Sequence, residues 1–179
     1  TWSSDGRTVY FSSMRGNICA IWRVDAGGGT PERLTPGSGP ESDPSVAASG
    51  TALAYSTAAD EGDEYVMVLD RLTGRSWNLT GRYQAYHPAL APDGGSVVFV
   101  SDRRENAREL WLQPLADGRP DGEPRRLTDQ RGSAAYPSFS PDGRWVAYYR
   151  IRDEDRQVWI ATVDGSAPPR RFTDHPGEN

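Results

Sequence analysis

The sequence of 179 residues contains one cysteine, Cys19, and no lysine. One cysteine excludes an internal disulfide bond. The longest apolar runs, such as residues 96–100, are far shorter than the roughly 20 residues that a membrane-spanning helix needs, so no transmembrane segment is predicted. No stretch keeps a helical apolar period for more than a turn or two, which argues against a helical fold.

Basic charge is not concentrated in any part of the sequence. All basic residues are arginines, they are interleaved with acidic residues in both halves, and the formal net charge is −5. A surface that binds phosphates needs a basic stripe. Nucleic acid is therefore not expected as a partner.

A turn sequence recurs four times and organises the chain. It reads S-P-D-G at residues 140–143, A-P-D-G at 91–94, S-S-D-G at 3–6 and, in a weaker form, A-S-G at 48–50. Proline presets φ, and glycine takes the left-handed position of the turn without steric cost. A second landmark, leucine or phenylalanine followed by threonine, keeps the same phase and ends at Thr35, Thr80, Thr128 and Thr173. Such regular recurrence indicates an internal repeat of forty-odd residues.

Each repeat is expected to form four short strands, because runs rich in β-branched and aromatic residues alternate with turn signals. The expected strands are 1–3, 7–12, 18–24 and 31–35; 44–48, 52–56, 65–70 and 75–80; 88–91, 96–101, 109–115 and 124–128; 137–140, 145–150, 157–163 and 170–173. The extra residues of the third repeat, 118–123, are expected to form a loop. Repeat length and strand number together favour an all-β propeller of four-stranded antiparallel blades. We predict one propeller domain over residues 1–179, with blades near 1–40, 41–84, 85–133 and 134–179.

The fourth repeat carries a family resemblance. Residues 137–148 read P-S-F-S-P-D-G-R-W-V-A-Y, and V-W at 158–159, D-G at 164–165 and R-R-F-T at 170–173 follow. This pattern resembles the TolB-type WD40-like (PD40) β-propeller repeat, and the other repeats match it less closely. The resemblance implies that the first strand of each blade lines a central channel. It also implies a protein or peptide partner at the channel face and a periplasmic or other extracytoplasmic location.

The connection into each inner strand is expected to lie at the channel mouth. Four residues there are predicted to bind the partner: Asp43, Tyr86, His87 and Tyr136. Tyr86 and Tyr136 are interpreted as exposed aromatic residues at equivalent loop positions, a residue type enriched at binding hot spots. The alternative is that both tyrosines pack under the neighbouring blade.

No catalytic residues, metal or cofactor are predicted. The sequence has no G-x-S-x-G or H-E-x-x-H motif, and Cys19 is expected to be a small buried apolar residue. His87 and His175 could meet on one rim, but two ligands do not complete a metal site. The acidic segment 60–64 is expected to be a solvated hairpin tip rather than a calcium site, and 153–155, flanked by Arg152 and Arg156, is expected to be a mixed-charge surface.

We therefore predict a non-enzymatic scaffold that binds a protein or peptide partner at the loop face near the channel. The chain resembles equally well the substrate-gating propeller of a prolyl-oligopeptidase-type serine hydrolase, whose catalytic domain lies outside these residues. The four repeats are expected to be part of a six- to eight-bladed propeller. A four-bladed ring, or two chains that complete eight blades by self-association through open blade edges, are the alternatives.

Overall fold

The structure is a computed structural model of residues 1–179 and describes all of them except 59–61, 82, 105–106, 130–131, 153–154 and 174–179. Five residues singled out above lie outside the described residues: Asp60, Glu61, Asp153, Glu154 and His175. The described part contains strands and turns but no α-helix. It also contains no helix that could span a membrane.

The strands form four antiparallel sheets, one after another along the chain. The first sheet is β1 (Thr8–Arg15), β2 (Ile18–Asp25) and β3 (Glu32–Arg33); the second is β4 (Glu41–Val46), β5 (Ala52–Ala58), β6 (Glu64–Asp70) and β7 (Ser76–Asn78). The third is β8 (Ala85–Leu90), β9 (Ser96–Arg104), β10 (Ala107–Ala116), β11 (Arg119–Pro120) and β12 (Arg125–Arg126); the fourth is β13 (Ser133–Phe139), β14 (Trp145–Arg152), β15 (Asp155–Thr162) and β16 (Arg170–Arg171). The predicted all-β fold of antiparallel sheets is confirmed.

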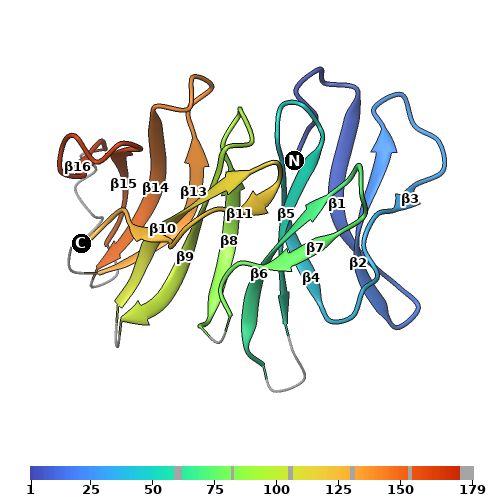
Figure 1. The fold of residues 1–179 in the computed structure, drawn as a ribbon, viewed down its shortest axis with the longest axis horizontal. Helices are drawn as coiled ribbons and strands as arrows, with labels where there is room; N and C mark the ends of the chain where they lie inside the picture. Colours follow the sequence, from blue (N-terminus) through green and yellow to red (C-terminus); the bar gives the residue numbers. More distant parts are fainter. Residues whose placement is uncertain (59–61, 82, 105–106, 130–131, 153–154, 174–179) are drawn as a thin grey trace.

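Figure 1 shows the four sheets in sequence order across the molecule, with β1–β3 at one end and β13–β16 at the other. Two local predictions were wrong. The expected strand at residues 1–3 is reduced to a single bridge between Trp2 and Val9, so the first sheet has three strands. The expected loop at residues 118–123 contains β11, which pairs with the end of β10 as a short hairpin.

The recurrent turn is closed by side chains as well as by its backbone. In the fourth sheet the Ser140 hydroxyl donates to Asp142 Oδ1 at 2.5 Å, and the same oxygen accepts from the Arg144 amide at 3.1 Å. Ser3 and Asp5 repeat this arrangement in the first sheet. These bonds hold the aspartates ionised, because the serine hydroxyl first and the backbone amide second lower the pKa of Asp5 and of Asp142.

Asp142→Ala is expected to lower the melting temperature at pH 7. The folded-state pKa of Asp142 is depressed, so its contribution is present above the ordinary value of 3.8 and disappears as the pH falls through the folded-state pKa. Melting curves of both proteins between pH 7 and pH 2.5 measure the effect, and the difference should shrink below pH 4. A difference that stays constant over this range would contradict this role of the carboxylate.

The threonine of the second landmark anchors the outer edge of each sheet. Its hydroxyl oxygen accepts a backbone amide from β2, β6, β10 or β15: Ile21 to Thr35, Val66 to Thr80, Leu110 to Thr128 and Val158 to Thr173. The same hydroxyl donates to a side-chain oxygen of Glu41, Asn78, Glu109 or Gln157, respectively. The landmark is therefore a structural feature of the repeat.

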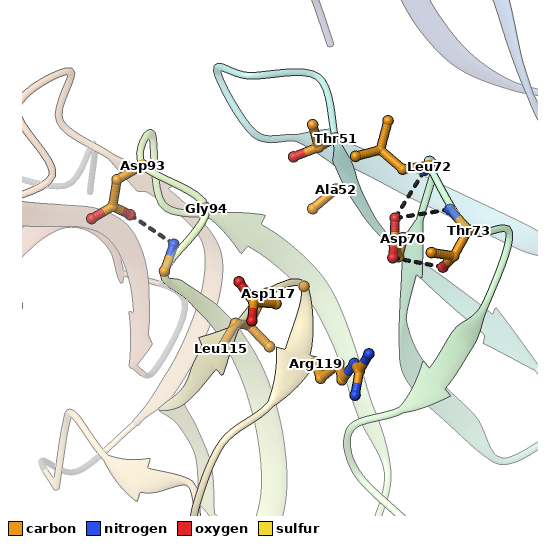
Figure 2. A pocket seen from close by; sticks show the side chains of 12 residues that line it. Thr51, Ala52, Asp70, Leu72, Thr73, Asp93, Gly94, Leu115, Asp117 and Arg119 are labelled. Carbon is orange, nitrogen blue, oxygen red and sulfur yellow. Dashed lines mark hydrogen bonds between the residues drawn. The ribbon is translucent and has the colours of Figure 1, made fainter.

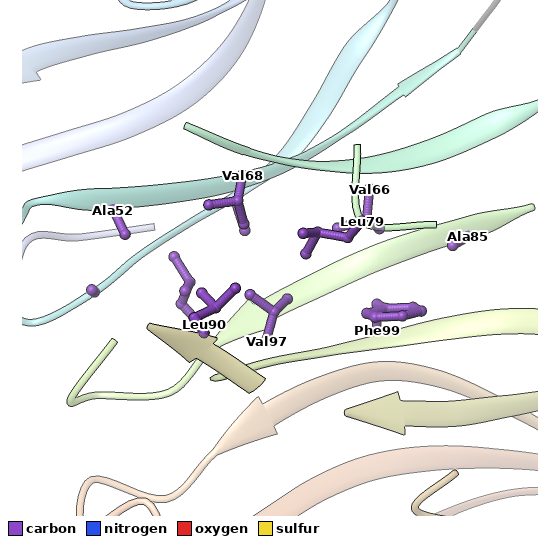
Figure 3. Close-up of a cluster of buried hydrophobic side chains, with 11 residues drawn as sticks. Ala52, Val66, Val68, Leu79, Ala85, Leu90, Val97 and Phe99 are labelled. Carbon is purple, nitrogen blue, oxygen red and sulfur yellow. The ribbon is translucent and has the colours of Figure 1, made fainter. Parts of the chain in front are cut away.

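The core consists of layers of apolar side chains between neighbouring sheets. Figure 3 shows the layer between the second and third sheets, where Val66 and Val68 lie with Val97 and Phe99. A second layer joins the third and fourth sheets, and a third joins the first and second. The four sheets therefore pack face to face as a stack. A sheet buries both of its faces only if it has a neighbour on each side.

A buried ion pair crosses from the third sheet to the fourth. Arg150 Nη2 lies 3.7 Å from Glu109 Oε1, and the two side chains are only 3% and 2% exposed. Burial raises the pKa of Glu109, while the Thr128 hydroxyl and the Arg150 guanidinium act in the opposite direction. The pair therefore depends on favourable local geometry to offset the cost of desolvation.

Candidate functional site

The inner strands of the second, third and fourth sheets carry the same irregularity. Their pairing with the next strand shifts register by one residue between Ser42 and Ser45, between Tyr86 and Ala89, and between Ala135 and Ser138. Each shift is a β-bulge, an extra residue that bends the strand and re-aims a side chain.

The bulge residue of each inner strand has a left-handed backbone. Asp43, His87 and Tyr136 have φ angles of 51°, 52° and 50°. This region is unfavourable for side chains other than glycine, and least so for aspartate and asparagine. Each of the three residues precedes a proline, and proline within a strand is typical of a bulge. Three X-Pro pairs at one repeat position were therefore a sequence signal for these bulges.

Aromatic rings link the bulges of the third and fourth sheets. The ring of His87 stacks on that of Tyr136 with centroids 3.9 Å apart and an interplanar angle of 28°. Tyr86 meets His87 edge-on at 5.0 Å, and Tyr149 meets Tyr136 edge-on at 6.4 Å. We call Asp43, Tyr86, His87, Tyr136 and Tyr149 the rim cluster.

The two tyrosines predicted to contact a partner occupy different environments. Tyr136 is 60% exposed, whereas Tyr86 is half-buried against the apolar layer between the third and fourth sheets. Both lie in strands rather than loops, and the repeat counterpart of Tyr136 is His87, not Tyr86. The expectation that they are equivalent exposed loop residues was therefore wrong, because Tyr136 stands at the bulge directly before its proline, whereas Tyr86 stands one residue before the bulge.

Buried polar atoms in the rim cluster lack hydrogen-bond partners in the described part of the chain. They are Tyr86 Oη and His87 Nδ1. Burial lowers the pKa of His87, against the opposing effect of Asp43 and Glu64, so the imidazole is neutral at pH 7. Burial likewise raises the pKa of Tyr86. Unsatisfied groups and left-handed residues in one place are costly, and such local costs are typical of functional sites.

Sequence reasoning missed two contributors to this region. Tyr149 is 47% exposed and lies beside Tyr136, and the guanidinium carbon of Arg108 lies 5.3 Å from the centre of the Tyr86 ring. Neither residue has a local motif that would single it out. Tyr149 reaches the rim cluster only through the pairing of β13 with β14, which places it opposite Ala135.

The inner strands of the second, third and fourth sheets, together with residues before β1, converge on a groove of about 370 Å³. Its walls include Trp2, Pro44, Pro88 and Pro137, so the prolines that follow the bulge residues line it. The rim cluster thus lies beside the groove toward which the inner strands face. The groove is therefore open to a peptide segment that approaches from the end at which the bulge residues lie.

A second pocket, of about 510 Å³, opens at the opposite ends of the strands, between the second and third sheets (Figure 2). Asp70 accepts from the Leu72 amide and the Thr73 hydroxyl, and Asp93 accepts from the Gly95 amide. These two carboxylates therefore stabilise turns. Among the residues that the structure describes, no group of three or more His, Cys, Asp or Glu side chains could hold a metal ion.

Cys19 is half-buried rather than fully buried, and its Sγ lies 3.5 Å from the carbonyl oxygen of Glu41. Its neighbour in space is therefore a backbone oxygen of the second sheet. His87, the described histidine, belongs to the third sheet. In the described part of the chain, Cys19 Sγ thus bonds a backbone oxygen and not the imidazole of His87.

No protein-family model matches the sequence. An uncharacterised protein of Agrobacterium fabrum is 28% identical over 157 residues, which cover 83% of this chain and 53% of that protein. The Tol-Pal system protein TolB of Francisella tularensis is 26% identical over 151 residues, which cover 83% of this chain and 34% of that protein. The chain thus spans about a third to a half of the length of these relatives.

Solved structures share the fold. A protein described as TolB from Agrobacterium tumefaciens superposes with a TM-score of 0.82 at 23% identity, over 95% of this chain and 62% of that one. TolB from Acinetobacter baumannii gives 0.76 at 21% identity, over 96% and 42%. A prolyl endopeptidase gives 0.67 at 14% identity, over 96% and 28%.

Stacked antiparallel sheets whose inner strands converge on one groove define a β-propeller protein. The sequence repeats and the structural neighbours agree on the type of propeller. The chain has a propeller-like fold, and its sequence is similar to bacterial TolB proteins.

Proposed function

We propose that this propeller is a non-enzymatic scaffold that binds a protein or peptide partner at the rim cluster. The proposal is based mainly on the conformation and exposure of Tyr136. Its side chain is 60% exposed although its backbone is left-handed. A left-handed conformation costs about 1–2 kcal/mol for a residue with a Cβ, and an exposed ring recovers little of this through burial. Recognition of a partner is a reason to keep such a residue, since tyrosine is enriched at binding hot spots.

The relatives support a protein partner. TolB of Francisella tularensis is named as a component of the Tol-Pal system. Non-enzymatic binding is further supported by the described residues, because the ring of His87 stacks on Tyr136 and its Nδ1 has no hydrogen-bond partner among them. The rim cluster therefore provides contact surface and no apparatus for bond cleavage.

A substrate-gating propeller of a prolyl-oligopeptidase-type hydrolase is the second candidate. The structural likeness to a prolyl endopeptidase, which involves 28% of that chain, favours it. A coding sequence that continues into a G-x-S-x-G segment would support the hydrolase. Further propeller repeats without such a segment would support the scaffold.

We also propose that the four sheets are consecutive blades of a six- to eight-bladed propeller. The outer face of the fourth sheet exposes Trp145 and Phe172, which are 39% and 64% exposed. Their repeat counterparts in the second sheet, Ala52 and Leu79, are buried at 4% and 6% by the third sheet. This face has the character of an interface between blades, and flanking coding sequence with further repeats would supply its neighbour.

Tyr136→Ala is expected to weaken partner binding at least about tenfold, because truncation of a hot-spot aromatic removes most of its contact. The probe is a displayed library of linear peptides, selected on the whole chain and measured with individual enriched peptides by calorimetry. Phe172→Ala, which removes an aromatic ring of similar exposure at the outer edge of the fourth sheet, is the matched control. Enriched peptides that bind both variants as well as the parent would refute the proposed site.

A fold control accompanies this measurement. Tyr136→Gly removes the same ring as Tyr136→Ala but relieves the left-handed backbone, so the glycine variant should be the more stable of the two by about 1 kcal/mol. Both variants should lose binding equally. Loss of binding that tracks stability would point to a structural role for Tyr136 instead.

A further inference from the structure

The three bulge positions of the inner strands share a backbone but not a side chain. Asp43, His87 and Tyr136 have φ angles within 2° of one another, and each is followed by proline. The residues that oppose these bulges on the neighbouring strands are Tyr55, Phe99 and Tyr148, all buried aromatic residues. The backbone conformation of the bulge is thus repeated in three sheets, whereas its side chain is a carboxylate in the second, an imidazole in the third and a phenol in the fourth.

The bulge frame is fixed by bonds between sheets that do not involve these side chains. The His87 amide donates to Ser56 Oγ at 3.2 Å, and the Leu90 amide donates to Ser45 Oγ at 2.9 Å. Because the backbone of the third-sheet bulge is held by Ser56 of the second sheet, the side chain at position 87 can change without loss of this bond. Such positions are suited to determine specificity.

The groups at these positions favour a cation. The exposed carboxylate of Asp43 acts on His87 across the boundary between the second and third sheets, and Glu64 acts on it as well. Beside them, the His87–Tyr136 stack has an exposed phenol ring. An aromatic face next to a carboxylate attracts ammonium and guanidinium groups.

Arg108 does not occupy this position. Its guanidinium carbon lies 5.3 Å from the centre of the Tyr86 ring, rather than over the His87–Tyr136 stack, and its charge also acts on His87. Tyr86 is also within the influence of the carboxylates of Asp102 and Glu64. The charges that act on Tyr86 and His87 are therefore those of one guanidinium, Arg108, and three carboxylates, Asp43, Glu64 and Asp102.

We propose that Asp43, His87 and Tyr136 are the specificity-determining residues of this propeller, and that together they take a lysine or arginine side chain of a peptide segment. The inference rests on the proposed function, whose binding site it uses. The aromatic stack provides the face for the cation, and Asp43 provides the counter-charge. The rest of the segment lies along the groove lined by the prolines that follow these residues.

The test uses peptides enriched from the displayed library on the whole chain. We expect the peptides that depend on Tyr136 to share a lysine or arginine, and we expect Asp43→Asn to weaken them about tenfold, with weaker binding at high salt. The matched control is Asp117→Asn: Asp117 also has a left-handed φ, of 50°, but lies with Asp93 and Gly94 in the pocket at the opposite ends of the strands. It should leave the affinity unchanged.

The outcomes separate the two proposals. Peptides that depend on Tyr136 but lack a basic residue, or that bind Asp43→Asn as tightly as the parent, would overturn the cation preference and leave the rim cluster as the binding site. Equal losses in Asp43→Asn and Asp117→Asn would show a general charge effect and would also overturn it. If no enriched peptide depends on Tyr136, the proposed binding site itself fails.

Discussion

Arg150→Met is expected to lower the free energy of unfolding by about 3 kcal/mol at pH 7, because removal of one partner leaves an uncompensated charge in the interior. That charge is Glu109, whose side chain is 2% exposed and whose Oε1 lies 3.7 Å from Arg150 Nη2. The pair joins the third and fourth sheets, so the loss weakens the contact between two repeats. Urea unfolding followed by tryptophan fluorescence measures it.

The pH dependence of this loss gives a second readout. Burial raises the pKa of Glu109 above its ordinary value of 4.5, and removal of the opposing guanidinium raises it further. A raised folded-state pKa adds stability below the unfolded value, and this stability is lost as the pH rises through the folded-state pKa. The deficit of Arg150→Met should therefore be smaller at pH 5 than at pH 7.

Two variants serve as controls for the ion pair. Glu109→Gln should cost about as much as Arg150→Met, because it leaves the buried guanidinium of Arg150, which cannot lose its proton, without the carboxylate that opposes it. The double variant should recover much of the stability lost in Arg150→Met, since it contains neither buried charge. A double variant that is as unstable as the sum of both single variants would show that the two groups act independently.

Phe99→Ala is expected to lower the free energy of unfolding by about 4 kcal/mol, the range for a large aromatic side chain lost from a closed core. Phe99 is 0% exposed and lies in the apolar layer between the second and third sheets (Figure 3). Its loss leaves a cavity between two sheets that cannot easily close, because both sheets are also held by their other neighbours. Chemical unfolding of the whole chain measures the change.

The repeat provides a matched control for Phe99. Phe11 pairs with Trp22 in the first sheet as Phe99 pairs with Trp111 in the third, so the two phenylalanines hold the same repeat position. Phe11 is only half-buried, and Phe11→Ala should cost about 1 kcal/mol. Equal losses at the two positions would mean that the outer face of the first sheet is covered in solution.

The strands and turns could be predicted from the sequence because their causes are local. Asp142 and Gly143 close a turn through Ser140 and Arg144, all within five residues. A related local pattern recurs in each repeat, in a weaker form at residues 48–50, so the fold class followed from repeat length and strand number. The hairpin at β11 was missed because Arg119 and Pro120 become a strand only through pairing with β10.

Four residues of the candidate site could be named from the sequence, but their exposure and their contacts could not be predicted from it. Asp43, Tyr86, His87 and Tyr136 could be named, since the connections into the inner strands were in phase with the repeat. Their environments could not, because one bulge residue decides which side chain faces out: Tyr136 is exposed, whereas Tyr86 packs inward. Tyr149 was not named, since it joins the cluster only across the β13–β14 pairing.

The sequence by itself determined the repeat, the strand order and the class of fold, because turn chemistry and alternation of side chains act over a few neighbouring residues. Only the tertiary structure decided the stacking of His87 on Tyr136 and the pairing of Arg150 with Glu109. Each of these contacts joins two different repeats. It depends on how one sheet packs against the next, and no spacing within a repeat specifies that geometry.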